Sequence, residues 1–209
     1  MDENSVIKVL KSELEFSDSS IDKLKKFHNY LLLYNKKYNL IAKSTENSIW
    51  LRHILDSAQL LRFIDKKEPI EIADLGSGAG FPGLVLAMQS KNNRFHVKLY
   101  EKSSVKRKFL EEIKEKLDLK KLEIKGDVYK SNINSNIIIC RAFKKLKEII
   151  HISREMVKIP HKMIILKGKN AQSEINNVSL GPNYSYKLER SITDHDSKII
   201  LVEKKRNGQ

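Results

Sequence analysis

The chain of 209 residues contains one cysteine, Cys140, and only four prolines. A single thiol excludes an internal disulfide and, with few other ligands available, a cysteine-based metal site, so we expect no metal. The first residues, M-D-E-N-S-V-I-K, are acidic and lack the apolar core of a signal peptide. No apolar run approaches the ~20 residues of a membrane span. We therefore expect a soluble, cytoplasmic protein with no membrane partner.

Negative charge is also scarce relative to positive charge. Lys and Arg number 40 against 26 Asp and Glu, which gives a formal net charge of +14. Such an excess indicates a polyanionic partner, either nucleic acid or an acidic membrane surface. Lysine-rich proteomes also produce basic proteins without such a role, but the charge favours nucleic acid.

The first third of the chain has the periodicity of helices. A short helix is expected at about 4–14, and a second pattern, T-E-N-S-I-W-L-R-H-I-L-D-S-A-Q-L-L-R-F-I, begins near Thr45 or Asn47 as N-cap. Between them one apolar stripe recurs at steps of three and four, made of Ile21, Leu24, Phe27, Leu31, Tyr34 and Tyr38. We predict a helical subdomain at 1–65, joined by a linker at about 65–69.

The pattern changes to strands from residue 69 onward. Apolar, β-rich stretches lie at 70–75, 95–100, 122–125, 136–140, 162–166, 184–190 and 198–203. Helical patterns separate the first five, most clearly Val105, Phe109, Ile113 and Leu117, each four residues apart. This alternation predicts an α/β domain at 66–209, with a parallel sheet covered by helices on both faces. About seven residues join the last two strands, too few for a parallel crossover, so these should form an antiparallel hairpin at the sheet edge.

Half of the eight glycines lie in one stretch, L-G-S-G-A-G-F-P-G at 75–83, directly after the first strand. Glycine supplies positive φ and lets a ligand approach the backbone. A ligand at the carboxyl end of the first strand is the general expectation for an open α/β sheet. We therefore predict a binding loop that uses Gly76, Gly78 and Gly80, followed by a helix from Phe81 or Pro82.

Two ligands fit this loop. Residues 78–83 satisfy the dinucleotide pattern G-x-G-x-x-G, and Glu101 lies about 20 residues on, where a ribose-binding acid belongs. A nicotinamide-dependent oxidoreductase is therefore one alternative. Asp74 opposes it, because a carboxylate there would repel a pyrophosphate but favour a cationic ligand. The terminal hairpin also departs from an all-parallel dehydrogenase sheet.

The stretch D-L-G-S-G-A-G resembles the motif of S-adenosylmethionine-dependent methyltransferases with a seven-stranded Rossmann-like sheet. More specifically, the chain resembles the bacterial small-subunit (16S) ribosomal RNA guanine-N7 methyltransferase family, also called glucose-inhibited division protein B. The matching stretches are Y-N-K-K-Y-N-L (34–40), L-R-H-I-L-D-S (51–57), D-L-G-S-G-A-G-F-P-G-L (74–84), S-V-K-R-K-F-L (104–110), C-R-A-F (140–143) and L-K-G (166–168).

The resemblance implies methyl transfer from S-adenosylmethionine to guanine N7 in small-subunit ribosomal RNA or the 30S particle, by a monomer. It also implies cofactor contacts at Gly76, Phe81, Val128 and Arg141, and Glu101 replaces an Asp common in the family. Asp74 would suit the cationic cofactor, and Asp127, after the third strand, could accept from the adenine amino group. Arg141 and Lys167, at the ends of strands four and five, should flank the transferred methyl as catalytic residues.

Other readings of the chemistry stay open. Cys140 could be a nucleophile of pyrimidine methylation, but Ile139 replaces the preceding proline of that mechanism, so a structural thiol is favoured. Another RNA target base, or a pseudo-enzyme that binds RNA without turnover, are further alternatives. His53 and Asp56 share a helix face and would either roof the cofactor pocket or form a packing pair. A basic stretch also lies in the helical pattern after Glu101. It is either a solvent-exposed helix face or a surface that contacts RNA, and it comprises Lys102, Lys106, Arg107 and Lys108.

Overall fold

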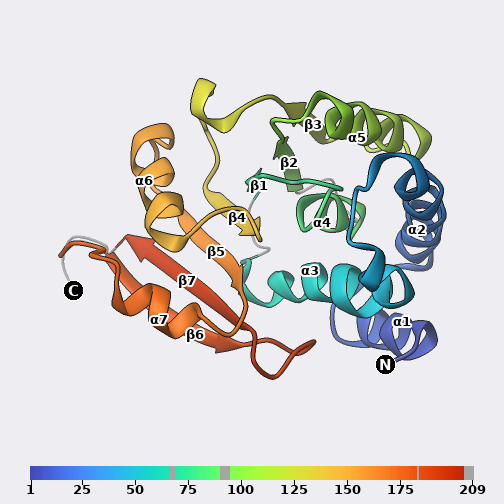
Figure 1. The fold of residues 1–209 in the computed structure, drawn as a ribbon, viewed down its shortest axis with the longest axis horizontal. Coiled ribbons are helices and arrows are strands. Elements are labelled where there is room, and N and C mark those ends of the chain that lie inside the picture. Colours follow the sequence, from blue (N-terminus) through green and yellow to red (C-terminus); the bar gives the residue numbers. More distant parts are fainter. Residues whose placement is uncertain (66–68, 90–94, 183, 205–209) are drawn as a thin grey trace.

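The expected sheet is present and has seven strands in the order β3-β2-β1-β4-β5-β7-β6 (Figure 1). The computed structural model describes residues 1–65, 69–89, 95–182 and 184–204. The strands are β1 (Ile70–Leu75), β2 (Phe95–Tyr100), β3 (Leu122–Lys125), β4 (Ile137–Arg141), β5 (Lys162–Lys167), β6 (Tyr184–Arg190) and β7 (Lys198–Lys204). β1 to β5 run parallel, whereas β7 pairs antiparallel with both β5 and β6. The predicted α/β class and its terminal hairpin are therefore confirmed.

Helices precede the sheet and connect its strands. They are α1 (Glu3–Ser12), α2 (Asp18–Tyr38), η1 (Lys43–Ser48), η2 (Trp50–Leu55), α3 (Asp56–Ala58), η3 (Gln59–Phe63), α4 (Gly83–Gln89), α5 (Ser104–Lys116), η4 (Val128–Lys130), α6 (Leu146–Met156) and α7 (Ala171–Asn176). No helix among the described residues is both long enough and apolar enough to cross a membrane. Most of the predicted linker, 66–68, lies outside the described residues, and the domain boundary stays a prediction.

Residues 43–63 depart from the single helix expected after Thr45 or Asn47. The segment begins at Lys43 and passes through a 3₁₀-helix (η1), a π-helix (η2), a short α3 and a second 3₁₀-helix (η3). The Thr45 hydroxyl does not cap the segment but donates to Ala42 O. π-Helical turns are rare in proteins, and those that occur are often at functional sites. Here the segment lies next to the C-terminal hairpin, where Gln59 Oε1 accepts from Ile192 N at 2.9 Å.

Alternation along the strands divides the core into two layers. One face of the sheet packs against α4, α5 and the N-terminal helices, and the other packs against α6 and α7 (Figure 1). The first layer receives Ile72, Val97, Leu99, Ile139 and Ile164, and the second receives Ala73, Leu75, Ile138, Cys140 and Met163. β2, β1 and β4 are parallel neighbours, so their carboxyl ends lie at the same edge of the sheet.

The helix predicted from Val105, Phe109, Ile113 and Leu117 is present as α5, but one residue of this apolar pattern lies outside the core. Val105 is 46% exposed, whereas Phe109, Leu110, Ile113 and Leu117 are buried. A step of four residues advances about 400° around an α-helix, so an apolar row spaced strictly by four drifts out of line with the core. The buried stripe of α5 therefore uses Leu110 and leaves Val105 in its first turn outside.

Candidate active site

The glycine-rich loop is fixed to the neighbouring strand by its backbone. The amides of Gly76 and Ser77 both donate to Tyr100 O at the end of β2, at 2.8 and 3.1 Å. Gly76, Gly78 and Gly80 have φ values of 71°, 59° and 99°, in the left-handed region. The loop therefore needs glycine at these positions, because other residues rarely adopt such φ values.

Three of the four glycines are also required by close packing. A Cβ at Gly76 would overlap the Phe143 ring, one at Gly80 would lie 2.8 Å from Leu84 Cδ2, and one at Gly83 would overlap Leu99. Gly78 is different, since the nearest heavy atom to its Cβ would be Gly76 O at 3.9 Å. Gly78 therefore borders open space in which a ligand can contact the backbone.

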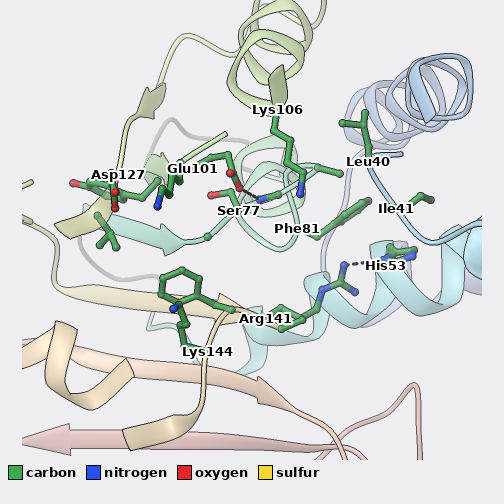
Figure 2. Close-up of a pocket in the computed structure, with 18 of the residues that line it drawn as sticks. Leu40, Ile41, His53, Ser77, Phe81, Glu101, Lys106, Asp127, Arg141 and Lys144 are labelled. Carbon is green, nitrogen blue, oxygen red and sulfur yellow. Dashed lines mark hydrogen bonds between the residues drawn. The ribbon is translucent and has the colours of Figure 1, made fainter. Parts of the chain in front are cut away.

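This open space belongs to a cavity of about 400 Å³ at the carboxyl edge of the sheet (Figure 2). The volume lies within the range of small-molecule sites. Seven predicted cofactor residues line it, namely Gly76, Gly78, Phe81, Glu101, Asp127, Val128 and Arg141. Its described lining also includes Ala142 and Phe143 of the C-R-A-F motif, together with Leu40 and Ile41, and none of these four is among the predicted cofactor contacts. Asp74 and Gly80 are not part of the described lining.

Glu101 connects the cavity to the loop. Its Oε2 accepts from Gly78 N at 2.9 Å, and its Oε1 accepts from Ser103 N at 2.7 Å. The side chain is therefore oriented before any ligand binds, and each carboxylate oxygen retains a further lone pair. Asp127 is similarly fixed, since its Oδ1 accepts from Tyr129 N at 3.1 Å. Two oriented carboxylates thus border the cavity, as Figure 2 shows for Glu101 and Asp127.

Asp74 lies behind the loop and is fully buried. Its Oδ2 accepts from Gly83 N at 2.9 Å, and Oδ1 has no hydrogen-bond partner among the described residues. Burial raises the pKa of this carboxyl to about 7, against the opposing effect of the hydrogen bond from Gly83. The position ties β1 to the start of α4, and direct contact of Asp74 with a cofactor stays a prediction.

The raised pKa of Asp74 predicts how stability depends on pH. The folded state holds this proton more tightly than the unfolded state, in which the pKa of Asp74 is near 3.8. The resulting stabilisation of the folded state is fully present below pH 3.8 and is lost as the pH rises towards 7. Asp74→Asn cannot titrate. We expect the unfolding free energy of Asp74→Asn relative to wild type to increase with pH across this window, by at most about 1.4 kcal/mol per pH unit.

Urea unfolding of both proteins at about pH 4.5, 6 and 7.5 measures this difference. The comparison with wild type is needed because His53 acts in the opposite direction. The pKa of His53 is lowered to about 3. Its neutral ring therefore stabilises the folded state fully above the usual pKa of 6.5, and this stabilisation is lost as the pH falls towards 3. A stability difference between the two proteins that is independent of pH would contradict the burial of a titrating Asp74.

Arg141 is the centre of a polar cluster between β4 and the N-terminal helices. Its NH2 lies 2.7 Å from His53 Nδ1, and its NH1 donates to Arg52 O at 2.8 Å and to Asp56 Oδ2 at 3.4 Å. The guanidinium also lies over the Phe81 ring, 5.1 Å from the centroid, and the His53 ring stacks on the same ring at 5.0 Å. His53 and Asp56 therefore have features of both hypotheses. Both side chains pack against Arg141 as a polar pair, and His53 also lines the cavity.

His53 is neutral in this cluster. Burial, and then the charges of Arg141 and Arg52, lower its pKa to about 3. Since a guanidinium only donates, His53 Nδ1 must accept from Arg141, and the protonated Nε2 then donates to Thr45 Oγ1 at 2.9 Å. Both ring nitrogens are therefore engaged, Nδ1 by Arg141 and Nε2 by Thr45, which fixes the ring against Arg141.

A second cavity of about 500 Å³ adjoins the first and shares His53, Arg141 and Ala142 with it. Lys167 lines this second cavity. Its Nζ donates to Lys144 O at 2.6 Å and to Glu174 Oε2 at 2.8 Å, so the amine is engaged by the protein. The structure thus brings Arg141 to both cavities and Lys167 to the second, and their catalytic roles stay predictions.

The basic stretch after Glu101 serves two purposes. Lys102 and Lys106 line the first cavity. Arg107 is committed locally, because its NH1 donates to Glu101 O at 2.9 Å and to Lys102 O at 2.7 Å. Lys106 is therefore a better candidate than Arg107 for contact with a ligand at the cavity mouth.

Cys140 is 1% exposed and belongs to the core layer under α6 and α7. Burial raises the pKa of its thiol far above the usual value, so the thiolate needed for nucleophilic attack is disfavoured. We expect Cys140→Ser to retain most methyl transfer, with a stability cost of about 1–3 kcal/mol if the new hydroxyl finds no partner. A loss of activity of about 1,000-fold in a folded, cofactor-binding Cys140→Ser protein would contradict this expectation and return covalent catalysis to consideration.

Solved structures share the fold. A crystal structure of TrmN from Thermus thermophilus aligns over 71% of this chain and 48% of that protein, with a TM-score of 0.55 and 15% identity. The chain thus spans about half the length of TrmN. The structure of MtNAS in complex with MTA and tNA aligns over 99% of this chain and 83% of that protein, with a TM-score of 0.60 and 10% identity. At these identities the likeness concerns the fold.

Sequence comparisons identify the family. The ribosomal RNA small subunit methyltransferase G of Orientia tsutsugamushi is 37% identical over 187 residues, which cover 89% of this chain and 91% of that protein. The protein of the same name from Rickettsia akari is 37% identical and covers 90% of this chain and 96% of its own length. The family model GidB, rRNA small subunit methyltransferase G, matches residues 20–200, a span that holds the glycine loop, Glu101 and the Arg141 cluster. The chain therefore belongs to the rRNA small subunit methyltransferase G family.

Proposed function

We propose that this protein transfers a methyl group from S-adenosylmethionine to N7 of a guanine in small-subunit ribosomal RNA. The observation that carries the proposal is the pair of adjoining cavities at the carboxyl edge of the sheet, which share His53, Arg141 and Ala142. One cavity contains the glycine loop and suits a methyl donor, and the neighbouring one offers room for an acceptor. Family membership removes the support for a nicotinamide-dependent oxidoreductase.

The residues of the first cavity fit the cofactor. S-adenosylmethionine supplies a methyl group activated by a sulfonium, on a molecule with an ammonium, a ribose diol and no phosphate. Glu101 would accept from the diol, and Asp127 and Val128 would border the adenine. Gly78 leaves room for close contact with the backbone. Two carboxylates in the wall favour such a ligand over a pyrophosphate.

Guanine N7 requires little of the protein beyond alignment. Its lone pair is free and no proton has to leave, so a general base is not needed. Catalysis then consists of holding N7 in line with the methyl carbon and sulfur, and of excluding water. Neutral His53, committed at both nitrogens, and buried Cys140 are consistent with this chemistry.

The RNA partner is supported by charge. The chain carries a formal net charge of +14, and Lys102, Lys106 and Lys144 line the first cavity. We propose that the protein acts as a monomer in the cytoplasm, on naked RNA or on an assembled small subunit. This partner is consistent with phosphate contacts as the main source of affinity.

Salt dependence tests the electrostatic part of this proposal. We expect the logarithm of RNA affinity to fall linearly with the logarithm of salt concentration, and Lys106→Ala to lower that slope by about 0.7–0.9 units if Lys106 contacts one phosphate. Filter binding across a salt series measures both slopes. Lys11→Ala, which removes a lysine paired with Asp18 at the start of α2, is the matched control. A wild-type slope near zero would contradict an electrostatic footprint.

A direct assay tests the reaction. Purified protein, S-adenosylmethionine with a labelled methyl group and small subunits from cells lacking the gene should yield labelled 7-methylguanosine after digestion to nucleosides. Label in another nucleoside would support a different target base. RNA binding without any label would support the pseudo-enzyme alternative.

A further inference from the structure

The second cavity is assembled from four separate parts of the chain. The N-terminal helical segment, the end of β4, the end of β5 and the β6–β7 loop each contribute to its wall. Representative residues are Arg52, Arg141, Gly168 and Thr193. The cavity thus adjoins the predicted methyl-donor site, and the β6–β7 loop forms part of its wall.

Asp56 connects three of these parts. Its Oδ1 accepts from Thr193 Oγ1 in the hairpin loop at 2.8 Å and from Gln59 Nε2 at 2.8 Å. Its Oδ2 lies 3.4 Å from Arg141 NH1, with side-chain exposures of 15% for Asp56 and 19% for Arg141. Asp56 therefore fixes Arg141 against the hairpin and balances its charge in a partly buried place.

The edge of guanine that contains N7 is complementary to hydrogen-bond donors such as those of Arg141. N7 lies next to O6, which is an acceptor, whereas adenine has an amino donor at that position. Arg141 offers five N–H donors and no acceptor, and its contacts with Arg52, Asp56 and His53 use three of them. A base whose N7 points to the first cavity would place O6 near this guanidinium, and guanine would be favoured over adenine.

Methyl transfer from a donor in the first cavity to a base in the second would also move charge between the two cavities. The sulfur–carbon bond breaks with its electron pair left on sulfur, and the N7 lone pair forms the new bond to the methyl carbon. One positive charge thus passes from sulfur to the purine, and no proton is released. Arg52, Arg141 and Lys167 in the second cavity would oppose a cationic base, and the carboxylate of Asp56 offsets Arg141.

We propose that the second cavity binds the acceptor guanine with O6 facing Arg141, and that Asp56 is a positioning residue that holds and neutralises Arg141 there. The inference rests on the proposed function. It assigns the acceptor base to a cavity separate from the cofactor, so the two sites can be disturbed independently.

Gly168→Leu tests the location. Gly168 lines the second cavity, and a Cβ there would meet no heavy atom within 4 Å, so leucine would take up cavity space without a clash at Cβ. We expect single-turnover transfer to small subunits to fall at least about tenfold, while S-adenosylhomocysteine affinity by calorimetry stays within about twofold. Gln172→Leu, which adds a leucine to the exposed face of nearby α7, is the matched control and should behave as wild type.

Asp56→Asn tests the positioning role, because it keeps an acceptor for Thr193 and removes the charge. We expect the single-turnover rate at saturating subunits to fall about 10- to 100-fold with cofactor affinity unchanged. Asp56→Glu should recover part of the rate, since it restores the charge. Thr193→Val removes the hydrogen bond from the hairpin loop and retains the Asp56 carboxylate. It should therefore lower the single-turnover rate less than Asp56→Asn does.

The outcomes separate the two proposals. A wild-type protein that makes no 7-methylguanosine removes the proposed function itself. An active wild type with unchanged transfer by both Gly168→Leu and Asp56→Asn overturns the inference alone. Loss of cofactor binding in either variant also overturns it, since the second cavity would then belong to the cofactor site.

Discussion

Gly78→Val is expected to abolish binding of S-adenosylmethionine. A Cβ at this position would meet no protein atom closer than 3.9 Å, and Gly78 lines the first cavity, where the cofactor is proposed to lie. Valine also resists the φ of 59° that the loop requires, at a cost of about 1–2 kcal/mol or more. Calorimetry with S-adenosylmethionine and with NAD, alongside thermal unfolding, measures both effects.

Gly83→Val is the informative comparison. Its Cβ would overlap Leu99 and lie 2.8 Å from the Asp74 side chain, so we expect loss of stability by overpacking of at least about 1–3 kcal/mol. Gly78→Val should therefore lose binding while it remains folded, and Gly83→Val should lose binding because it unfolds more readily. A folded Gly78→Val protein with wild-type affinity for S-adenosylmethionine would place the cofactor elsewhere.

Arg141→Ala is expected to lower single-turnover methyl transfer at saturating RNA by at least about 100-fold. The guanidinium is shared by both cavities and is held by His53, Asp56 and the Phe81 ring. Its removal leaves the Asp56 carboxylate without its cationic partner, which for a buried pair costs about 3–5 kcal/mol and somewhat less at the partial exposure found here. Stability must therefore be measured with activity, by urea unfolding of the same preparation.

Arg141→Lys and Lys167→Ala separate charge from geometry. Lysine keeps the charge of Arg141 but not the planar fork that reaches three partners, so we expect it to recover only a small part of the rate. Lys167→Ala should act more weakly, because Glu174 keeps its hydrogen bond from Leu146 N at 2.6 Å. Single-turnover rates equal to wild type in both Arg141→Ala and Lys167→Ala would remove these two residues from the active site.

The sheet could be predicted from sequence because its strands are short apolar runs bounded by turns and charged helices. β1, β2, β3 and β6 match the predicted bounds. The segment 43–63 could not be predicted, since its geometry depends on contacts with residues far away in sequence. Asp56 and Gln59 hydrogen-bond to the β6–β7 loop more than 130 positions later, and no local pattern records such contacts.

The sequence motifs predicted several of the residues that line the candidate site. They did not predict which of the motif residues are buried or bonded to other side chains. The spacing of Gly76, Gly78 and Glu101 places them around one cavity, because the loop after one strand and the end of the next strand meet in a parallel sheet. Asp74 has the same motif context but is fully buried, and only the fold shows that its carboxylate faces Gly83 N. Similarly, only the fold shows that Lys167 forms an ion pair with Glu174, which lies seven residues later in α7.

The central claim is that this protein methylates guanine N7 in small-subunit ribosomal RNA. Its most direct test is a map of 7-methylguanosine in that RNA from cells with the gene, without it, and with the gene restored. We predict one modified guanine that disappears without the gene, returns with the wild-type gene and stays absent with Gly78→Val. An unchanged 7-methylguanosine map in cells without the gene would contradict the account.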